Sequence, residues 1–416
     1  MSELETLLSD SLSRAAGRAP AAPHDLLQRV AAARRRRRRG TAAAGAAAVA
    51  LVTMAGFLVT TSISDGAPRE AAASSTGLGQ ARPLKKVWPG AVHTIPLTLP
   101  NGRPYHTERF LDPDTLLVRT LKGGHADRSD GLWAYNVKTR AASRLVAVKT
   151  PKGTVGSWSF TAMGEGQLVW WTLRRDGDRR VVDIWAAPVK GGAQREVTSF
   201  HGAPGRAEID AFEVADGKVV WSLGRDGGVY EARLAGGASK KIAGTEGLHL
   251  MRWPWAAAFQ FPRKKHFDRP PYGELVNVLT GERRAAPATQ SQQAQSEQAQ
   301  SQQAQSQQPW DCGITWCVSG DKARTRDGSR ERDLPGYPFG NLPAMDRFLV
   351  VTKMDGARFK GMVLYDLETG KSGDLGIKRN RDGSFSSPTL DHRAPAMFAY
   401  ELGDKMVVVD LAVAAH

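Results

Sequence analysis

A short pattern that recurs along residues 132–411 most constrains what this chain can fold into. Each copy is an apolar stretch that ends on Val or Leu, followed in most copies by a tight turn with Thr-Gly or Gly-Gly. The last apolar residues of the six copies are Val137, Val189, Leu234, Val278, Leu367 and Leu411. Their spacings are 52, 45, 44, 89 and 44 residues, and 89 is about twice 44. A seventh, degenerate copy is therefore expected near Trp316–Gly320.

A period of about 40–50 residues with several strands in each unit is typical of a β-propeller. Asp-Gly and Asn-Gly pairs, which favour hairpin turns, recur between the copies. We predict an all-β, seven-bladed β-propeller over residues 88–416, with six blades or an array of β-sandwiches as alternatives. Because the last copy lies at Leu411, the outer strand of its blade must come from the start of the domain. The alternating segment Ala91–Leu99 fits this role.

One stretch of the expected propeller has a different composition. Residues 290–308 are almost entirely Gln, Ser and Ala. Such a sequence cannot build a packed core, so we expect a solvated loop or a frayed helix inserted between the fourth and fifth units.

The segment 41–63 contains 23 residues without a charge, long enough for a transmembrane helix. Six arginines stand directly before it: Arg34, Arg35, Arg36, Arg37, Arg38 and Arg39. Positive charge beside a membrane helix stays on the cytoplasmic side. We therefore predict a single-pass protein of the cell membrane, with its N-terminus inside, a flexible tether over 64–87 and the propeller extracytoplasmic. A cleaved signal peptide and a buried helix of a soluble protein are the alternatives.

Residues 1–40 are predicted to form a basic cytoplasmic segment with two short helices. Ser2 and Glu5 fit a capping box, and Pro20 to Pro23 separate the helices. The apolar positions of the two helices are Leu4, Leu7, Leu8, Leu12, Leu26, Leu27 and Val30. Helices this small cannot bury their own apolar stripes well, so we expect this face to dock on a partner protein, on the membrane surface or between the helices themselves.

The two cysteines, Cys312 and Cys317, are close in sequence. Outside the cell the environment is oxidising, so a local disulfide is expected. A zinc site would need two more ligands at suitable spacing, and the sequence has none nearby. We expect no cofactor and no metal. The polar loop 123–130 could hold a cation with His125, Asp127 and Asp130, but a solvated turn is the simpler interpretation. The net charge of +15 is spread beyond the arginine run, so we expect no nucleic-acid partner.

Catalytic motifs are absent from the sequence. It contains no Gly-x-Ser-x-Gly elbow, no phosphate-binding loop and no His-Glu-x-x-His zinc motif. We therefore expect a protein that is not an enzyme. The alternative hypothesis is a propeller hydrolase or lyase that acts on a cell-envelope substrate, because propellers host both binding and catalysis.

With its repeat copies and its basic, membrane-adjacent start, the chain resembles membrane-anchored, extracytoplasmic β-propeller proteins of high-GC Gram-positive bacteria, of the kind described as TolB-like or WD40-like. The segment from Leu4 to Leu27, followed by the arginines, is similar to the cytoplasmic stub of membrane proteins that partner sigma factors. This resemblance implies a sensor or scaffold. Its propeller would bind a protein or an envelope component outside, and its cytoplasmic segment would hold a sigma factor or another protein.

Overall fold

A computed structural model of the protein describes residues 81–121, 129–157, 161–202, 209–224, 226–258, 274–285, 310–340, 342–355, 358–380, 385, 388 and 396–416. The contacts divide the chain into two units, Met1–Ser74 and Ser75–His416, and all described residues belong to the second. The expected membrane segment, the six arginines, the cytoplasmic helix face and the insertion at 290–308 lie outside the described residues. No helix of the described part of the chain has the length and apolar character to cross a membrane.

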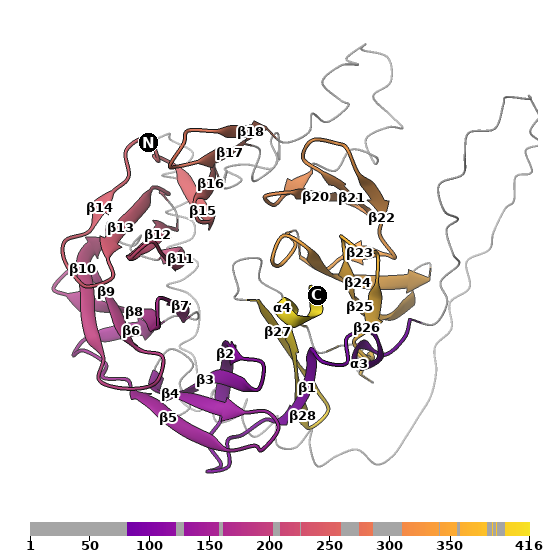
Figure 1. Ribbon diagram of the computed structural model, residues 1–416, viewed down its shortest axis with the longest axis horizontal. Coiled ribbons are helices and arrows are strands. Elements are labelled where there is room, and N and C mark those ends of the chain that lie inside the picture. Colours follow the sequence, from indigo (N-terminus) through magenta and orange to yellow (C-terminus); the bar gives the residue numbers. More distant parts are fainter. Residues whose placement is uncertain are drawn as a thin grey trace, which may run out of the picture. The chain divides into compact units, whose positions relative to one another are not determined.

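The second unit is a ring of seven antiparallel sheets, which confirms the seven-bladed β-propeller (Figure 1). Sheet 1 is β2 (Tyr105–Asp112), β3 (Thr115–Leu121), β4 (Ser129–Asn136) and β5 (Ala142–Ala147). Sheet 2 is β6 (Thr154–Ser157), β7 (Ala162–Gly164), β8 (Gln167–Asp176), β9 (Arg179–Pro188) and β10 (Arg195–Gly202). Sheet 3 is β11 (Ile209–Ala215), β12 (Lys218–Leu223), β13 (Val229–Arg233) and β14 (Lys240–Lys241).

The other four sheets complete the ring. Sheet 4 is β15 (Leu248–Arg252), β16 (Trp255–Ala258), β17 (Glu274–Asn277) and β18 (Arg283–Ala285). Sheet 5 is β19 (Asp311–Cys312), β20 (Trp316–Ser319), β21 (Lys322–Thr325) and β22 (Glu331–Asp333). Sheet 6 is β23 (Tyr337–Pro338), β24 (Phe348–Asp355), β25 (Arg358–Asp366) and β26 (Ser372–Asp374). Sheet 7 is β27 (Met397–Leu402), β28 (Lys405–Asp410) and β1 (Val92–Pro96).

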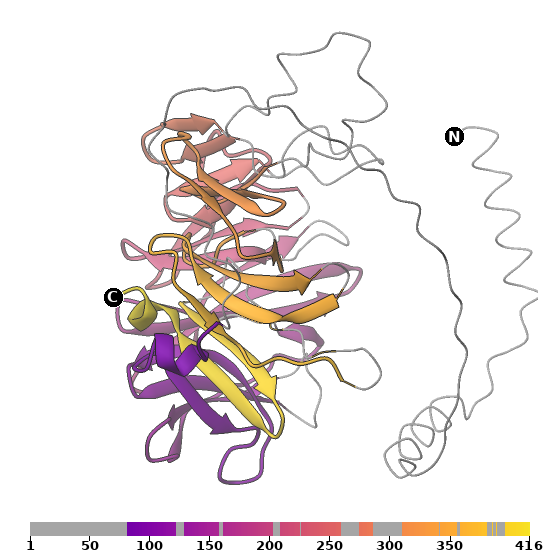
Figure 2. The ribbon, with the colours of Figure 1, turned by 90° about the vertical axis from the view of Figure 1, so that its right-hand side faces the viewer.

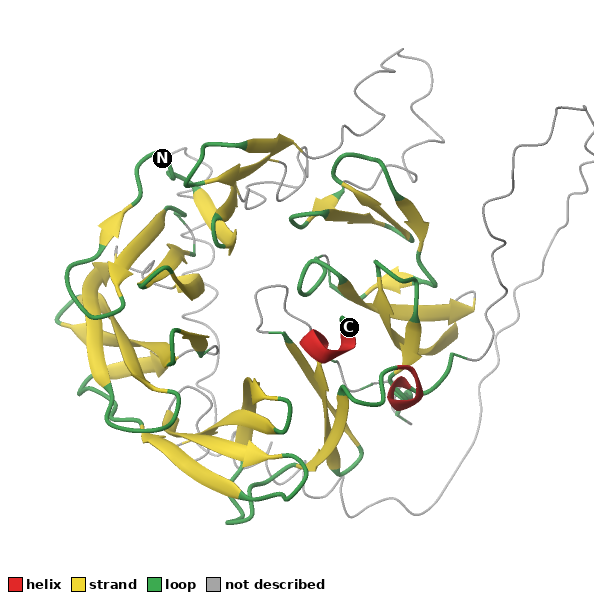
Figure 3. Cartoon of the chain, in the orientation of Figure 1, coloured by secondary structure: helices red, strands yellow, loops and turns green. Residues whose placement is uncertain are grey.

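The ring closes through the start of the unit, as the alternation of Ala91–Leu99 predicts. Strand β1 pairs with β28 from Val92 opposite Val409 to Pro96 opposite Lys405. Two short helices flank this closure, α3 (Leu84–Val87) and α4 (Leu411–Ala414) (Figure 3). Leu84 in α3 is buried and packs in the core of sheets 6 and 7, so the part of the sequence-predicted tether around this residue packs on the ring.

One backbone hydrogen bond repeats in all seven sheets. Strands are counted by their place in a four-stranded unit, so that β6 and β7 share the first place in sheet 2, and β27, β28 and β1 take the second, third and fourth places in sheet 7. The residue after the third strand donates its N–H to the residue just before the second strand, with N···O distances of 2.8–2.9 Å. The donors are Val137, Val189, Leu234, Val278, Arg326, Leu367 and Leu411. Six of them are the residues on which the sequence copies align. The seventh, degenerate copy therefore ends at Arg326, one strand later than the expected position near Trp316–Gly320, and it carries a charged residue in place of Val or Leu.

The core lies between neighbouring sheets. Sheets 2 and 3, for example, bury Trp171 and Trp221 in a shared cluster, and sheets 6 and 7 bury Phe348 and Phe398. Six such clusters join neighbouring sheets, but among the described residues none spans sheets 4 and 5. Across that junction Arg326 Nη1 donates to Arg284 O at 3.4 Å, so a polar contact stands where the other six junctions have an apolar cluster.

Candidate functional site at the junction of sheets 4, 5 and 6

The recurrent hydrogen bond places two kinds of turn side by side on one face of the ring. These are the turn between the first and second strands and the turn after the third strand. We call this side of the ring the turn face. The hairpins between second and third strands lie on the opposite face because consecutive strands are antiparallel. Figure 2 shows the ring from the side, with α4 at one of its faces.

The first strands β11 and β15 carry four ionisable residues in two pairs. In the first pair, His249 Nδ1 lies 2.5 Å from Asp210 Oδ2. Ser222 Oγ donates to Asp210 Oδ1 at 2.5 Å and accepts from Leu250 N at 2.9 Å. Ser222 is fully buried and His249 is 4% exposed. A nucleophilic serine must reach its substrate, so this Ser-Asp-His group serves to join sheets 3 and 4 and not to catalyse.

The second pair is Glu213 on β11 and Arg252 at the end of β15. Both oxygens of Glu213 lie 3.3 Å from Trp253 N. Burial raises the pKa of Glu213, while this backbone contact and the charge of Arg252 oppose the rise. Arg252 is exposed, and no described residue accepts a hydrogen bond from its guanidinium. The charge of Arg252 thus acts on Glu213, but among the described residues its guanidinium makes no hydrogen bond.

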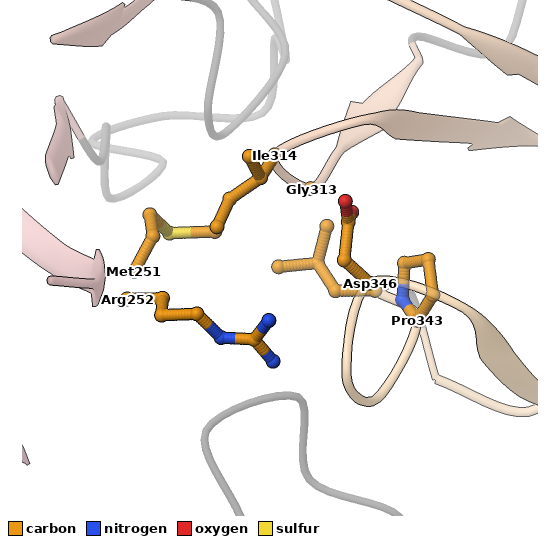
Figure 4. A pocket seen from close by; sticks show the side chains of 7 residues that line it. Met251, Arg252, Gly313, Ile314, Pro343 and Asp346 are labelled. Atoms are coloured by element: carbon orange, nitrogen blue, oxygen red, sulfur yellow. The ribbon is translucent and has the colours of Figure 1, made fainter. Parts of the chain in front are cut away.

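Arg252 reaches into a small pocket at the turn face, opposite a loop of sheet 6 (Figure 4). The pocket has a volume of about 20 Å³, which is room for one water molecule. Met251, Ile314, Leu342 and Pro343 form an apolar rim around it. Figure 4 shows Arg252 on one side and Asp346 on the other, so residues of sheets 4, 5 and 6 converge here.

Asp346, in the turn before β24 of sheet 6, binds the loop between β19 and β20 of sheet 5. Its Oδ2 accepts from Thr315 N at 2.7 Å, and its Oδ1 lies so close to Gly313 that a Cβ on that residue would sit 2.7 Å from it. A side chain at position 313 would therefore have to displace the carboxylate of Asp346. Burial raises the pKa of Asp346, and hydrogen bonds from Thr315 and Trp316 together with the charge of Arg252 oppose the rise.

The same loop of sheet 5 is held from its other side. Cys312 and Cys317 form the predicted disulfide, with both residues fully buried. Arg326 Nε donates to Gly313 O at 2.6 Å, and its Nη2 donates to Cys312 O at 3.3 Å. Burial lowers the pKa of Arg326 to about 10. The disulfide, Arg326 and Asp346 together fix the backbone that presents Ile314 to the pocket, so the pocket wall is preorganised.

Of the sequence-predicted residues, only the two cysteines take part in this site. The arginines 34–39, the cytoplasmic apolar face and the loop with His125 and Asp127 lie outside the described residues. Asp130, next to that loop, accepts hydrogen bonds from Arg103 and Thr120 at 2.5 and 2.6 Å. Sequence reasoning missed Arg252 and Asp346. Neither belongs to a motif; the nearest signals were the Trp253-Pro254-Trp255 turn and the strand that begins after Asp346.

Searches with protein-family models and against curated proteins find no match to this sequence. Solved structures resemble the chain at low identity. They include the WD40 domain of SCAP from fission yeast (9% identity, 72% of this chain, 82% of the other, TM-score 0.35). An oligogalacturonate lyase in complex with manganese has 11% identity, with coverage of 74% and 77% and a TM-score of 0.32.

A third similar structure is an acylaminoacyl peptidase from Pyrococcus horikoshii, with 11% identity and a TM-score of 0.40. The alignment covers 73% of this chain but 49% of the peptidase, so the chain spans about half of that protein's length. These three proteins differ in function and all have TM-scores below 0.5. The seven sheets by themselves establish the propeller fold.

Proposed function

We propose that the protein is a non-enzymatic, single-pass membrane protein that acts as a sensor or scaffold. In this proposal the helix is formed by residues 41–63, and the propeller binds a protein or envelope component outside the cell. Residues 1–33 would then hold a cytoplasmic partner such as a sigma factor. The membrane part is supported by the uncharged segment and the arginines before it.

The observation that carries the binding function is the state of Arg252. It is an exposed guanidinium without a hydrogen-bond acceptor among the described residues, and the pocket that it enters is lined by both apolar and polar groups. Arginine and methionine are enriched in protein interfaces, and arginine is enriched among the residues that carry most of the binding energy. The pocket is too small for a sugar or a nucleotide, but Arg252 at its edge is exposed and can meet a group on the surface of a partner. We therefore propose a partner that presents an acidic group to Arg252.

Orientation is tested first with a reporter that is active only outside the membrane, fused through a linker after His416. We expect activity in the membrane fraction of fractionated cells. Activity only in the medium would mean a cleaved, secreted propeller and would remove the signalling route. An inactive reporter on a folded protein would overturn the orientation.

The binding face is tested by crosslinking the full-length chain in cells and comparing two charge reversals. Arg252→Glu should reduce recovery of the crosslinked partner at least tenfold, because an acidic group would meet a like charge. Arg179→Glu is the matched control, since Arg179 is exposed on the β8–β9 hairpin of the opposite face. Equal recovery with both variants would exclude the turn face as the binding surface.

A second candidate function is a propeller hydrolase or lyase for an envelope substrate. One observation favours it: Glu213 and Asp346 both have pKa values raised by burial, and both interact with Arg252. Perturbed carboxyl groups of this kind occur at active sites. Turnover of isolated cell-wall polysaccharide by the purified chain, lost in Glu213→Gln, would establish this function in place of the first.

A further inference from the structure

A second, larger pocket lies where the ring closes, between sheets 7 and 1. Its volume is about 320 Å³, at the lower end of the range for small-molecule sites. One wall is the end of β2 and the turn that follows it; the other is formed by α4 and the residues around it. Phe110, Leu111, Ala412 and Val413 make these walls largely apolar. Because the turn after β2 and the residues after β28 both belong to the turn face, the pocket lies on that face.

Arg109 is the cationic group of this seam pocket. Its Nε is buried, and no described residue accepts a hydrogen bond from it. The neighbouring acid, Glu108, is already engaged, because its Oε1 lies 2.7 Å from Arg119 Nε and its Oε2 accepts from Thr161 N at 3.0 Å. Burial also lowers the pKa of Arg109, which marks a guanidinium short of polar neighbours. A buried donor without an acceptor is costly, and a small shift of the guanidinium toward a bound acceptor would satisfy it, which favours a ligand that supplies one.

Two carboxylates also line the pocket, and they restrict the charge of that ligand. Asp410 Oδ1 accepts from Ala412 N at 2.9 Å and Val413 N at 3.1 Å, and Asp112 Oδ1 accepts from Asp114 N at 2.9 Å. His416 also lines the pocket, but Arg109 is its one arginine, and the two aspartates beside that arginine disfavour a doubly charged phosphate. A single carboxylate can pair with Arg109 in a two-point hydrogen bond, while its apolar body fills the rest of the pocket.

We propose that the seam pocket binds a small monocarboxylate with an apolar body, whose carboxylate pairs with Arg109. The ligand is either a free organic acid or the C-terminal carboxylate of a peptide, which share this chemistry. The proposal does not depend on the partner of Arg252, because the two pockets share no lining residue. It adds a small-molecule site to the propeller.

The test is calorimetric titration of the full-length chain in lipid nanodiscs, with empty nanodiscs as the blank. The probes are 4-phenylbutyrate, its charge-inverted analogue 4-phenylbutylamine, and N-acetyl-leucine, which stands in for a peptide C-terminus. Two variants alter the pocket. Arg109→Gln removes the cation, and Ala412→Trp fills the space from an exposed position of α4. Arg179→Gln on the opposite face is the control.

We expect 4-phenylbutyrate to bind the wild type and the control alike. Arg109→Gln should weaken binding at least tenfold, Ala412→Trp should abolish it, and the amine should not bind. Tighter binding of N-acetyl-leucine than of 4-phenylbutyrate would assign the site to peptide termini, and the reverse to free acids. Equal binding of the acid and the amine, no effect of Arg109→Gln in a folded variant, or no binding by the wild type would overturn the proposal. None of these outcomes changes the crosslinking result expected for Arg252.

Discussion

Arg347 and Asp366 form a two-point ion pair within sheet 6, with Nε–Oδ1 at 2.7 Å and Nη2–Oδ2 at 2.8 Å. The remaining nitrogen, Nη1, donates to Ala415 O at 2.7 Å. One guanidinium thus ties sheet 6 to the segment that follows sheet 7. Asp366 is 1% exposed; burial alone would raise its pKa, but hydrogen bonds from Arg347 and Thr369 hold that pKa below its ordinary value.

We predict that Arg347→Met destabilises the ring by about 2–4 kcal/mol, because Asp366 is left buried without its partner. Urea denaturation followed by tryptophan fluorescence measures this. The double variant Arg347→Met/Asp366→Asn should recover part of the loss. A carboxylate whose pKa is lowered in the folded state stabilises the protein above its unfolded-state pKa, and this stabilisation is lost as the pH falls through its folded-state pKa. The destabilisation by Arg347→Met should therefore shrink below about pH 4. An unchanged effect at pH 3 would mean that the charge of Asp366 contributes nothing.

Arg326 occupies a repeat position that holds Val or Leu in the other six sheets, yet we predict that Arg326→Leu destabilises the protein by about 2 kcal/mol. The substitution restores the repeat pattern but removes the donors to Gly313 O and Cys312 O, and buried carbonyls without donors are costly. The control is Arg233→Leu, an exposed arginine one position earlier in the repeat of sheet 3, with an expected change within about 0.5 kcal/mol. Stabilisation by Arg326→Leu would show that the arginine does not hold the loop.

In sheets 1, 4 and 6 the turn after the third strand contains a residue in the left-handed backbone conformation. Arg140 has φ +62° where Gly281 has φ +74° and Gly370 has φ +72°. All three donate N–H to the residue four positions earlier at 2.8 Å. We predict that Arg140→Gly stabilises by about 0.5–1 kcal/mol. Gly281→Ala should destabilise by about 1 kcal/mol from φ alone, because nothing lies within 4 Å of the added Cβ. Thermal unfolding of both variants checks this, and changes of the same sign would contradict it.

Asp311 on β19 should make the stability of the fold depend on pH. Burial raises its pKa to about 6. A raised carboxyl pKa means that the protonated form is favoured in the folded state. The contribution of Asp311 to the free energy of unfolding is therefore full below its unfolded-state pKa near 3.8, and it is lost as the pH rises through about 6. Asp311→Asn should therefore match the wild type in stability at pH 4 and exceed it by about 1–2 kcal/mol at pH 7.5, a figure reduced for partial exposure. Equal stabilities at both pH values would contradict this.

The fold could be predicted from the sequence because its evidence is local and repeated. Each copy ends on an apolar residue before a tight turn, and six of the seven N–H donors of the recurrent hydrogen bond follow this rule. The closing strand could be predicted from the alternation of Ala91–Leu99. The copy that ends at Arg326 was predicted one strand too early. A charged residue replaces the expected apolar one there, while the preceding strand contains the apolar run Trp316–Val318, which fits the repeat pattern better.

The candidate site could not be predicted in the same way. Arg252 and Asp346 belong to sheets 4 and 6, and no local pattern relates residues from different sheets of a ring. Only the disulfide, whose cysteines are neighbours in sequence, could be anticipated. Arg109 could not be predicted for a related reason. Its pocket forms only where residues from the end of the chain pack against β2.

The pairing of β1 with β28 also sets an order of events during synthesis. Roughly 300 residues separate the two strands, and a ribosome adds about 5–20 residues per second, so β1 is made on the order of half a minute before its partner exists. Throughout that interval the strand has an open edge that other chains could pair with. A product truncated before Lys405 would keep that edge permanently. Synthesis of β28 therefore removes one of the two edges at which β1 could pair with another copy of the chain.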